Sequence, residues 1–347
     1  MTSPSLVIPS YLPSGNQLGL VSVGFSGGQR KPGVEVAPDF LVKAGLLDDL
    51  REALGYTLHY DNTIHTYAED LPKEDPPQLN MRNPLSVSAA TKKISSQVYS
   101  HAKEGRLTLT LGGDHSIAIG SISGAARAIR ERLNRSLNVI WVDAHADINT
   151  PETSTSGSIH GMPCAFLTGI ANPDPIFSWL KDLMHEGSAI EAKRLVYIGL
   201  RDVDIPEKKI LRDNNIKAFS MHDIDRWGIG HCVELALEHL AGLDRPDIKG
   251  VKGYIYEGLG PTYLSFDVDA LDPMWAPSTG TPVRGGLTLR EGDFICECVH
   301  ATGALVGMDL VEVNPIAPGY TADSPGAEAT IRAGCSLIRC ALGESLL

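Results

Sequence analysis

Short runs of apolar residues recur along the chain and predict the strands of a sheet. They are rich in Val, Ile, Leu and Thr and cover residues 18–24, 107–111, 137–142, 195–199, 216–220, 263–268 and 305–311. Longer segments with helical periodicity lie between them, among them residues 117–133, 232–240 and 327–342. Strands that alternate with helices are typical of a mostly parallel sheet with helices on both faces. We therefore predict an α/β fold with three layers, α/β/α.

Two segments interrupt this alternation. Residues 71–84 are rich in proline and polar residues, which favours an exposed loop. Residues 244–261 are rich in glycine and turn-forming residues, and we interpret them as an inserted loop that precedes a strand. Neither segment is long or polar enough to separate two domains, and so we predict a single domain over residues 1–347.

The composition narrows the classes of function. The chain has 347 residues, of which 21% are charged, and a formal net charge of −12. Such an acidic chain is a poor candidate for binding nucleic acid, because phosphates are neutralised by basic patches. A cationic substrate suits it better. No apolar run reaches the ~18 residues that a membrane-spanning helix needs, so we expect no membrane partner.

Several features favour a cytoplasmic location. The N-terminus lacks the basic segment and apolar core of a secretory signal, and the first arginine is Arg30, which argues against a mitochondrial presequence. The six cysteines form no C-x-x-C pair and are too sparse for a disulfide scaffold. We expect them to be reduced thiols.

Three of the apolar runs end in clusters of Asp and His. The first leads into Asp114 and His115, the second into D-A-H-A-D at residues 143–147, and the third into D-V-D at residues 267–269. Residues two apart in an extended chain point to the same side. Because α/β folds bind ligands at the carboxyl ends of their strands, we expect these side chains to converge on one crevice.

Four carboxylates in one crevice would repel one another, and this repulsion would raise their pKa values. Two divalent cations would balance the four negative charges. A set of four Asp and two His, dominated by oxygen ligands, favours Mn²⁺ over a structural Zn²⁺, which prefers thiolate and imidazole. Nickel and cobalt remain alternatives.

Other interpretations apply to some of these residues. A lone Asp at a strand end is usually a helix cap or a turn former, and Asp114, Asp202 and Asp272 fit that description. The stretch G-F-S-G-G at residues 24–28 fits the G-x-S-x-G pattern of serine hydrolases. It follows the first strand, however, and the acids elsewhere belong to the metal site. We interpret this stretch as a loop that shapes the crevice.

The chain resembles the arginase and agmatinase family, the ureohydrolases. The matching motifs are GGDHS at residues 112–116, DAHAD at residues 143–147 and SFDVDALDP at residues 265–273. The likeness extends from GFSGGQRKPG at residues 24–33 to EVNP at residues 312–315 and so covers most of the chain. It implies hydrolysis of the guanidinium group of L-arginine to urea and L-ornithine by a hydroxide that bridges two manganese ions in each subunit.

The resemblance also implies roles for single residues. One ion would be held by His115, Asp143, Asp147 and Asp267, and the other by Asp143, His145, Asp267 and Asp269, so that Asp143 and Asp267 bridge them. Catalytic roles fall to His160 as proton shuttle, to Glu312, which would hold the guanidinium, and to Asp147.

The amino-acid end of the substrate would meet a second set of residues. By the resemblance, Asn149 and Ser156 would contact the α-carboxylate, with Ser158 beside them. Asp204 and Glu207 would contact the α-ammonium, and Thr281 would lie near the guanidinium. Ser158 stands where animal-type arginases tend to carry Asn.

Two alternatives differ in substrate or in class. A sibling enzyme could act on agmatine or guanidinobutyrate, each of which lacks one end group of arginine. A non-catalytic metal-binding paralogue would need none of the residues that contact substrate. By analogy with the family, we also expect a homo-oligomer, a trimer or a hexamer.

Overall fold

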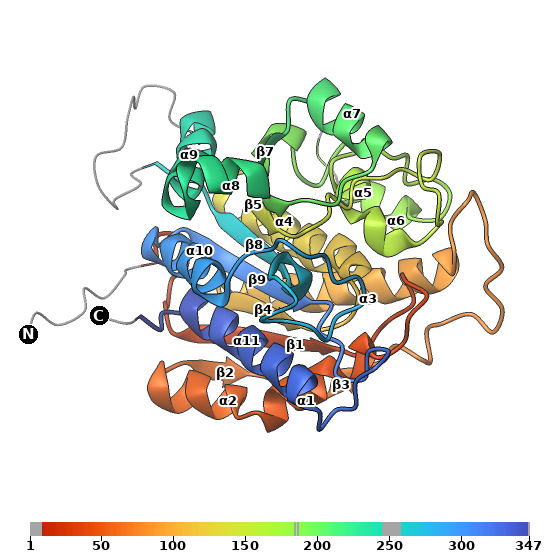
Figure 1. Ribbon diagram of the computed structural model, residues 1–347. Coiled ribbons are helices and arrows are strands. Elements are labelled where there is room, and N and C mark those ends of the chain that lie inside the picture. Colours follow the sequence, from red (N-terminus) through yellow and green to blue (C-terminus); the bar gives the residue numbers. More distant parts are fainter. Residues whose placement is uncertain (1–8, 184, 186, 245–257, 346–347) are drawn as a thin grey trace, which may run out of the picture.

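The computed structural model describes residues 9–183, 185, 187–244 and 258–345. Most of the inserted loop expected at residues 244–261 lies outside the described residues. The chain alternates between strands and helices along most of its length, and Figure 1 shows helices packed around a central sheet.

The strands form one sheet in which every pairing is parallel. They are β1 (Gln17–Val23), β2 (Thr57–His59), β3 (Ile64–His65), β4 (Leu107–Leu111), β5 (Asn138–Val142), β6 (Leu195–Leu200), β7 (Lys217–Ser220), β8 (Thr262–Asp267) and β9 (Leu305–Val311). Their order is β2-β1-β4-β9-β8-β5-β6-β7, and β3 also pairs with β1. The seven predicted strands are confirmed to within one residue at each end. The short strands β2 and β3 were missed because they are only partly buried and carry no long apolar run.

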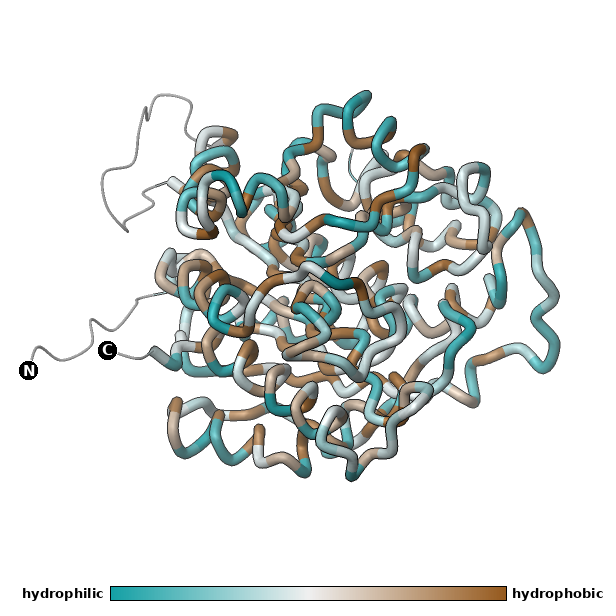
Figure 2. The backbone as a smooth tube through the Cα atoms, in the orientation of Figure 1, coloured by the Kyte–Doolittle hydropathy of each residue, from teal (hydrophilic) through white to brown (hydrophobic). Residues whose placement is uncertain are grey.

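The helices lie on both faces of the sheet, which confirms the three-layer α/β/α prediction (Figure 1). They are α1 (Ala37–Lys43), α2 (Leu46–Asp48), α3 (Pro84–Lys103), α4 (Ala118–Leu133), α5 (Pro163–Leu167), α6 (Ser178–Lys181), α7 (Ile205–Asp213), α8 (Met221–Trp227), α9 (Ile229–Asp244), α10 (Leu289–Ala301) and α11 (Pro325–Ala341). Helices α3, α4 and α5 pack together, and α9, α10, α11 and α1 form the other layer. Figure 2 shows hydrophilic and hydrophobic residues mixed along the outer helices, as expected when one face covers a core.

The buried core follows the central strands. Every residue of β4, β5, β8 and β9 is buried, and these four strands are neighbours in the middle of the sheet. Because they are parallel, their carboxyl ends lie along the same edge. No helix in the described part of the chain has the length and apolar character to cross a bilayer. All six cysteines are free thiols, as expected.

Helices α3 and α4 approach each other closely because α4 carries glycine where they meet. A Cβ atom at Gly124 would lie 2.3 Å from the backbone oxygen of Ser95, and one at Gly120 would lie 2.4 Å from that of Thr91. Backbone atoms cannot move aside as a flexible side chain can, so a larger residue would force the helices apart.

We therefore expect Gly124→Ala to lower the free energy of unfolding by about 1–3 kcal/mol, because of this overlap. The matched control is Gly242→Ala in α9, where a Cβ atom meets nothing within 4 Å. That control should be neutral or slightly stabilising, since alanine favours a helix. Chemical denaturation measures both variants. Equal stability of the two would contradict the proposed close packing of α3 on α4.

Candidate metal centre

The loops that follow β4, β5 and β8 bring the predicted metal ligands together. His115 begins a short 3-10 helix after β4, Asp143 follows β5 directly, and Asp267 ends β8. Strand β9 lies between β4 and β8, and β5 lies on the other side of β8. The three sequence motifs, which are far apart in the chain, therefore meet at one edge of the sheet.

His115 lies at the centre of the first group of ligands. Its side chain is fully buried, and its Nδ1 atom lies 3.1 Å from Asp143 Oδ2, 3.2 Å from Asp147 Oδ2 and 3.2 Å from Asp267 Oδ2. This nitrogen nevertheless makes no hydrogen bond of acceptable geometry. A buried imidazole nitrogen that faces three carboxylate oxygens without a hydrogen bond fits the ligand shell of a cation.

His145 forms the second group. Its Nδ1 atom lies 3.3 Å from Asp143 Oδ1 and 3.2 Å from Asp269 Oδ2. The two oxygens of Asp143 thus face two different imidazoles, because Oδ2 faces His115. The ligand atoms of His115, Asp143 and Asp147 lie within 4.8 Å of one another, as do those of Asp143, His145 and Asp269. The residues present therefore fit two cations that share Asp143.

Local hydrogen bonds fix the orientation of these carboxylates. The backbone N–H of His145 donates to Asp143 Oδ1 (2.7 Å), and the backbone N–H of Asp269 donates to Asp267 Oδ1 (2.8 Å). The indole N–H of Trp141 donates to Asp143 Oδ2 (2.9 Å). Each carboxylate keeps its second oxygen or a further lone pair free for a ligand, because a carboxylate accepts up to about four hydrogen bonds.

The orientation of His115 depends on residues that sequence reasoning missed. Its ring stacks on Trp141, with ring centroids 3.9 Å apart. Its Nε2 atom lies 2.9 Å from Ser265 Oγ, and this hydroxyl donates to Asp309 Oδ1 (2.6 Å). Because the hydroxyl hydrogen of Ser265 is used by Asp309, Ser265 Oγ accepts a hydrogen bond from Nε2–H of His115, which leaves the Nδ1 lone pair directed at the carboxylates. Ser265 stands in the quoted motif, but nothing in its spacing indicates this contact.

The electrostatics of the site agree in part with the expected repulsion. Burial, reinforced by neighbouring carboxylates, raises the pKa of Asp147 to about 6 and that of Asp267 well above its ordinary range. Burial is also the main cause that raises the pKa of Asp269. These three groups resist ionisation without a compensating positive charge.

The expectation that repulsion raises all four pKa values is wrong for Asp143. Burial acts to raise its pKa, but the imidazoles of His115 and His145, which face its two oxygens, outweigh that effect and lower it. Asp143 differs from its neighbours because two imidazoles approach it, one at each oxygen. Of these four carboxylates, Asp143 is therefore the one that is most readily ionised before a cation binds.

Glu312 lies at the end of β9, beside this group. It is buried, with 1% of its surface exposed, and its φ of +62° is in the left-handed region. Its Oε1 accepts hydrogen bonds from the backbone N–H of His115 (2.9 Å) and from His160 Nδ1 (3.2 Å). Its Oε2 accepts from the side-chain amide of Gln29 (2.7 Å). Sequence reasoning missed Gln29, although it lies within the stretch at residues 24–33 that carried the resemblance.

His160 has a pKa that favours its charged form. Burial acts to lower the pKa, but the hydrogen bond with Glu312 and the negative charges of Asp147 and Asp114 outweigh it and raise the pKa to about 9. Its backbone N–H donates to the carbonyl of Gly28 (3.1 Å), so the loop at residues 24–28 does border the site.

The residues expected to contact the amino-acid end lie in two adjoining segments. The side-chain amide of Asn149 donates to Asp204 Oδ2 (3.0 Å), which links the loop after β5 to the start of α7. Ser156 is exposed, and its Oγ accepts from the backbone N–H of Ser158 (3.1 Å), which is itself buried. These hydrogen bonds join Asn149 to Asp204 and Ser156 to Ser158.

The side chains of Glu207 and Thr281 already form hydrogen bonds within the protein, which the sequence did not predict. The carboxylate of Glu207 accepts the backbone N–H groups of Ile148 (3.1 Å) and Asp204 (2.9 Å), and burial raises its pKa to about 7. The hydroxyl of Thr281 donates to Asp269 Oδ2 (3.0 Å).

Two of the three residues interpreted as caps or turn formers, Asp114 and Asp272, accept backbone hydrogen bonds of that kind. Asp114 caps the 3-10 helix of His115 by accepting from Ser116 (2.9 Å), and Asp272 accepts three backbone N–H groups of its own loop region. Asp202 is exposed, with Oδ2 4.0 Å from His145 Nε2.

Comparison with known proteins assigns the chain to a family. The model of the arginase family matches residues 16–343. This protein belongs to the arginase family. It is similar to arginases of Neurospora crassa (62% identity over all of this chain and 91% of that protein) and Emericella nidulans (61% identity over all of both chains). Among solved structures it is similar to the arginase of Bacillus subtilis, with 32% identity, 95% of this chain and all of that chain covered, and a TM-score of 0.78.

For this arginase-family protein we predict a pH-dependent stability that depends on His160. Its pKa is about 9 in the folded protein and about 6.5 in an unfolded chain, so its stabilising effect is complete below about pH 6.5 and is lost as the pH rises through about 9. As the pH rises between these limits, the free energy of unfolding of the metal-free wild type should fall by on the order of 2–3 kcal/mol more than that of His160→Asn. Denaturant unfolding at several pH values measures the difference.

The substitution His222→Asn, at an exposed position of α8, controls for the loss of an imidazole. A difference between wild type and His160→Asn that stays constant from pH 6.5 to pH 9 would show that Glu312 does not hold the charged form.

Proposed function

We propose that this protein hydrolyses L-arginine to L-ornithine and urea at a centre of two manganese ions. The observation that carries the proposal is the meeting of His115, His145 and four aspartates in a chain that matches arginases over its whole length. The Asp-rich and imidazole-containing ligand set suits Mn²⁺, since hard oxygen ligands dominate it.

The distances support one set of ligands for each ion. We assign His115, Asp143, Asp147 and Asp267 to the first ion, because three carboxylates approach the same imidazole nitrogen. We assign Asp143, His145 and Asp269 to the second ion on the same ground, and we add Asp267 to this set from the resemblance to the family. Asp143 would bridge the ions through its two oxygens, which face different imidazoles. Asp267 would be the second bridge.

The substrate presents a chemical difficulty that the protein must overcome. A guanidinium is a planar, resonance-stabilised cation with a pKa of about 12.5–13.8, and it resists attack by water. Bound to the site, the two divalent cations would supply a nucleophile by lowering the pKa of water from about 15.7 toward about 7. The side chains of the protein must then bind the guanidinium, orient it and protonate the amine that leaves.

Glu312 is suited to bind and orient the guanidinium. Three donors hold its buried carboxylate in place, and the hydrogen bond and the charge of His160 outweigh burial and lower its pKa, so that it stays ionised. A fixed carboxylate can form a charge-assisted pair with a planar guanidinium and set its angle to the nucleophile.

His160 is suited to move the proton. Its Nδ1 faces Glu312, while its other ring nitrogen can donate to the leaving nitrogen. When the C–N bond breaks, this proton converts the leaving group into the neutral amine of ornithine, and the proton of the added hydroxyl would pass to the carboxylate of Asp147, so that the carbon leaves as neutral urea. Asp147 would act with them, since its charge supports the protonated imidazole as well as the first ion.

The contacts proposed for the amino-acid end select arginine over its siblings. Asn149, Ser156 and Ser158 would bind the α-carboxylate, which agmatine lacks. Asp204 and Glu207 would bind the α-ammonium, which guanidinobutyrate lacks. Thr281 contacts Asp269, which favours a role close to the guanidinium rather than at the amino-acid end. We further propose a cytoplasmic homo-oligomer, a trimer or a hexamer, in line with the free cysteines and the family.

The proposed function predicts urea release from L-arginine when the purified protein is loaded with manganese. Agmatine and guanidinobutyrate, assayed side by side, should give kcat/KM values lower by at least about 100-fold, because each leaves charged or polar groups of the site unpaired. Comparable turnover of agmatine would favour a sibling guanidine hydrolase. No urea from any of the three compounds would favour a non-catalytic metal-binding protein.

The bridging role of Asp143 gives a separate prediction. Asp143→Asn removes the negative charge shared by both ions, so kcat/KM should fall by at least about 100-fold and bound manganese should fall below two per subunit. Elemental analysis after dialysis measures the metal. The control Asp213→Asn removes an exposed carboxylate of α7 and should retain both properties. Full metal content with full activity in Asp143→Asn would refute the bridging role.

A further inference from the structure

The segment between β3 and α3, residues 66–83, runs along the outside of the molecule, and we call it the strap (Figure 1). Its sequence predicted an exposed loop at residues 71–84, and the structure confirms a loop that is largely exposed. Met81 is an exception, because only 2% of its surface is exposed. A buried methionine within an exposed loop indicates that the loop is packed against the protein at this point.

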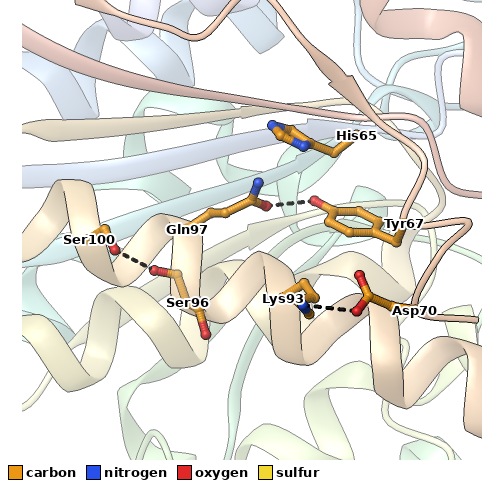
Figure 3. Close-up of a pocket in the computed structure, with 7 residues that line it drawn as sticks. All are labelled: His65, Tyr67, Asp70, Lys93, Ser96, Gln97 and Ser100. Atoms are coloured by element: carbon orange, nitrogen blue, oxygen red, sulfur yellow. Dashed lines mark hydrogen bonds and ion pairs between the residues drawn. The ribbon is translucent and has the colours of Figure 1, made fainter.

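The strap is fixed to α3 where it begins. A surface pocket of about 350 Å³ lies between the start of the strap and one face of α3. Figure 3 shows the residues that line it. Across it, the hydroxyl of Tyr67 donates to Gln97 Oε1 (2.8 Å), and Lys93 Nζ forms an ion pair with Asp70 Oδ1 (2.9 Å). These groups satisfy one another, so the pocket serves as an anchor for the strap.

The strap is fixed again where it ends. The carboxylate of Asp75 accepts the backbone N–H groups of Leu85 (3.1 Å) and Ser86 (2.6 Å) in the first turn of α3. The side-chain amide of Asn83 donates to the carbonyl of Gly27 (3.0 Å), in the loop that borders the metal centre. Residues 75–83 of the strap are therefore attached both to α3 and to the loop at residues 24–28.

That turn contacts the loop at residues 149–158, which carries Asn149, Ser156 and Ser158. The side-chain amide of Asn80 donates two hydrogen bonds to this loop, one to the carbonyl of Pro151 (2.7 Å) and one to that of Ser154 (2.8 Å). The backbone N–H of Arg82 donates to the carbonyl of Gly157 (2.8 Å).

We infer that Asn80 is a positioning residue that holds the loop at residues 149–158 in the shape that binds the amino-acid end of the substrate. This inference rests on the proposed function, because it takes Asn149 and Ser156 as the contacts of the α-carboxylate. Pro151 and Ser154, whose carbonyls Asn80 binds, lie between those two residues in the chain. Fixing both points shapes the part of the loop that separates the two contacts.

Position 80 requires a residue that tolerates a left-handed backbone and also supplies two N–H donors, and asparagine does both. The backbone of residue 80 has a φ of +56°, in the left-handed region, which asparagine, aspartate and glycine tolerate best. The side chain must also supply two N–H donors to two carbonyls, which aspartate and glycine lack. Asn80 therefore combines a left-handed backbone in the turn with a side-chain amide that donates two hydrogen bonds.

The expected effect falls on binding rather than on chemistry. A loop that is not held must become ordered when the substrate binds, and this entropic cost weakens binding. The side-chain amide of Asn80 donates to Pro151 and Ser154, and within the described residues it forms no hydrogen bond with the metal centre, Glu312 or His160. Loss of the amide should raise KM and leave kcat nearly unchanged.

The test compares two substitutions of Asn80 with one matched control. Asn80→Gly keeps the left-handed backbone and removes the donors, and Asn80→Asp keeps the size of the side chain but turns a carboxylate toward two carbonyls. The control is Asn62→Gly, since Asn62 has a φ of +58° and is exposed in the turn between β2 and β3. The control loses an asparagine and gains flexibility without touching the loop at residues 149–158.

For the manganese-loaded protein we expect KM for L-arginine to rise about 3- to 10-fold in both Asn80 variants, with kcat within about twofold of wild type. The dissociation constant of L-ornithine, measured by calorimetry, should rise in parallel because ornithine has the same amino-acid end. Asn62→Gly should match the wild type in both measurements, and manganese content should be equal in all four proteins.

Two outcomes would overturn the inference. One is a KM and an ornithine affinity in the Asn80 variants that stay within about twofold of Asn62→Gly. The other is a fall in kcat with KM unchanged, which would indicate a general structural effect. If the wild type itself releases no urea from arginine, the proposed function fails, and ornithine binding still decides whether Asn80 shapes the loop.

Discussion

The structure depends on the confinement of four carboxylates and two imidazoles in a crevice from which water is largely excluded. Burial alone would keep most of these carboxyl groups protonated, as the raised pKa values of Asp147, Asp267 and Asp269 indicate. Imidazoles at 3.1–3.3 Å offset part of the cost, and they do so chiefly at Asp143. The remaining imbalance makes the centre a receptor for cations.

The parallel sheet explains how such a centre can be assembled at all. Strands β4, β9, β8 and β5 are neighbours, and at the same edge each ends in, or is followed within a few residues by, a residue that the centre uses. Their apolar side chains form the core, and the polar residues follow where each strand leaves it. The residues that stabilise the fold and the charged residues of the centre therefore occupy different parts of each strand and its following loop, so the charges do not disrupt the apolar core.

The residues around the centre orient the side chains of the centre through hydrogen bonds. Trp141 orients Asp143, Ser265 and Asp309 orient His115, and Gln29 fixes one oxygen of Glu312. The strap extends this arrangement outward to the loop at residues 149–158. Preorganisation of this kind lowers the ordering that binding and reaction would otherwise require.

The sequence by itself determined the alternation of strands and helices, the class of the fold and the clusters of Asp and His, because apolar periodicity and the spacing of ligands are local properties of the chain. Only the tertiary structure decided which distant groups meet. Gln29 and Glu312 are joined by a hydrogen bond, and so are Asn80 and Pro151, yet no spacing in the sequence relates either pair. The opposite pKa directions of Asp143 and Asp267 likewise follow from which imidazole nitrogens face each oxygen, since electrostatic energy depends on distance in space and on burial rather than on position along the chain.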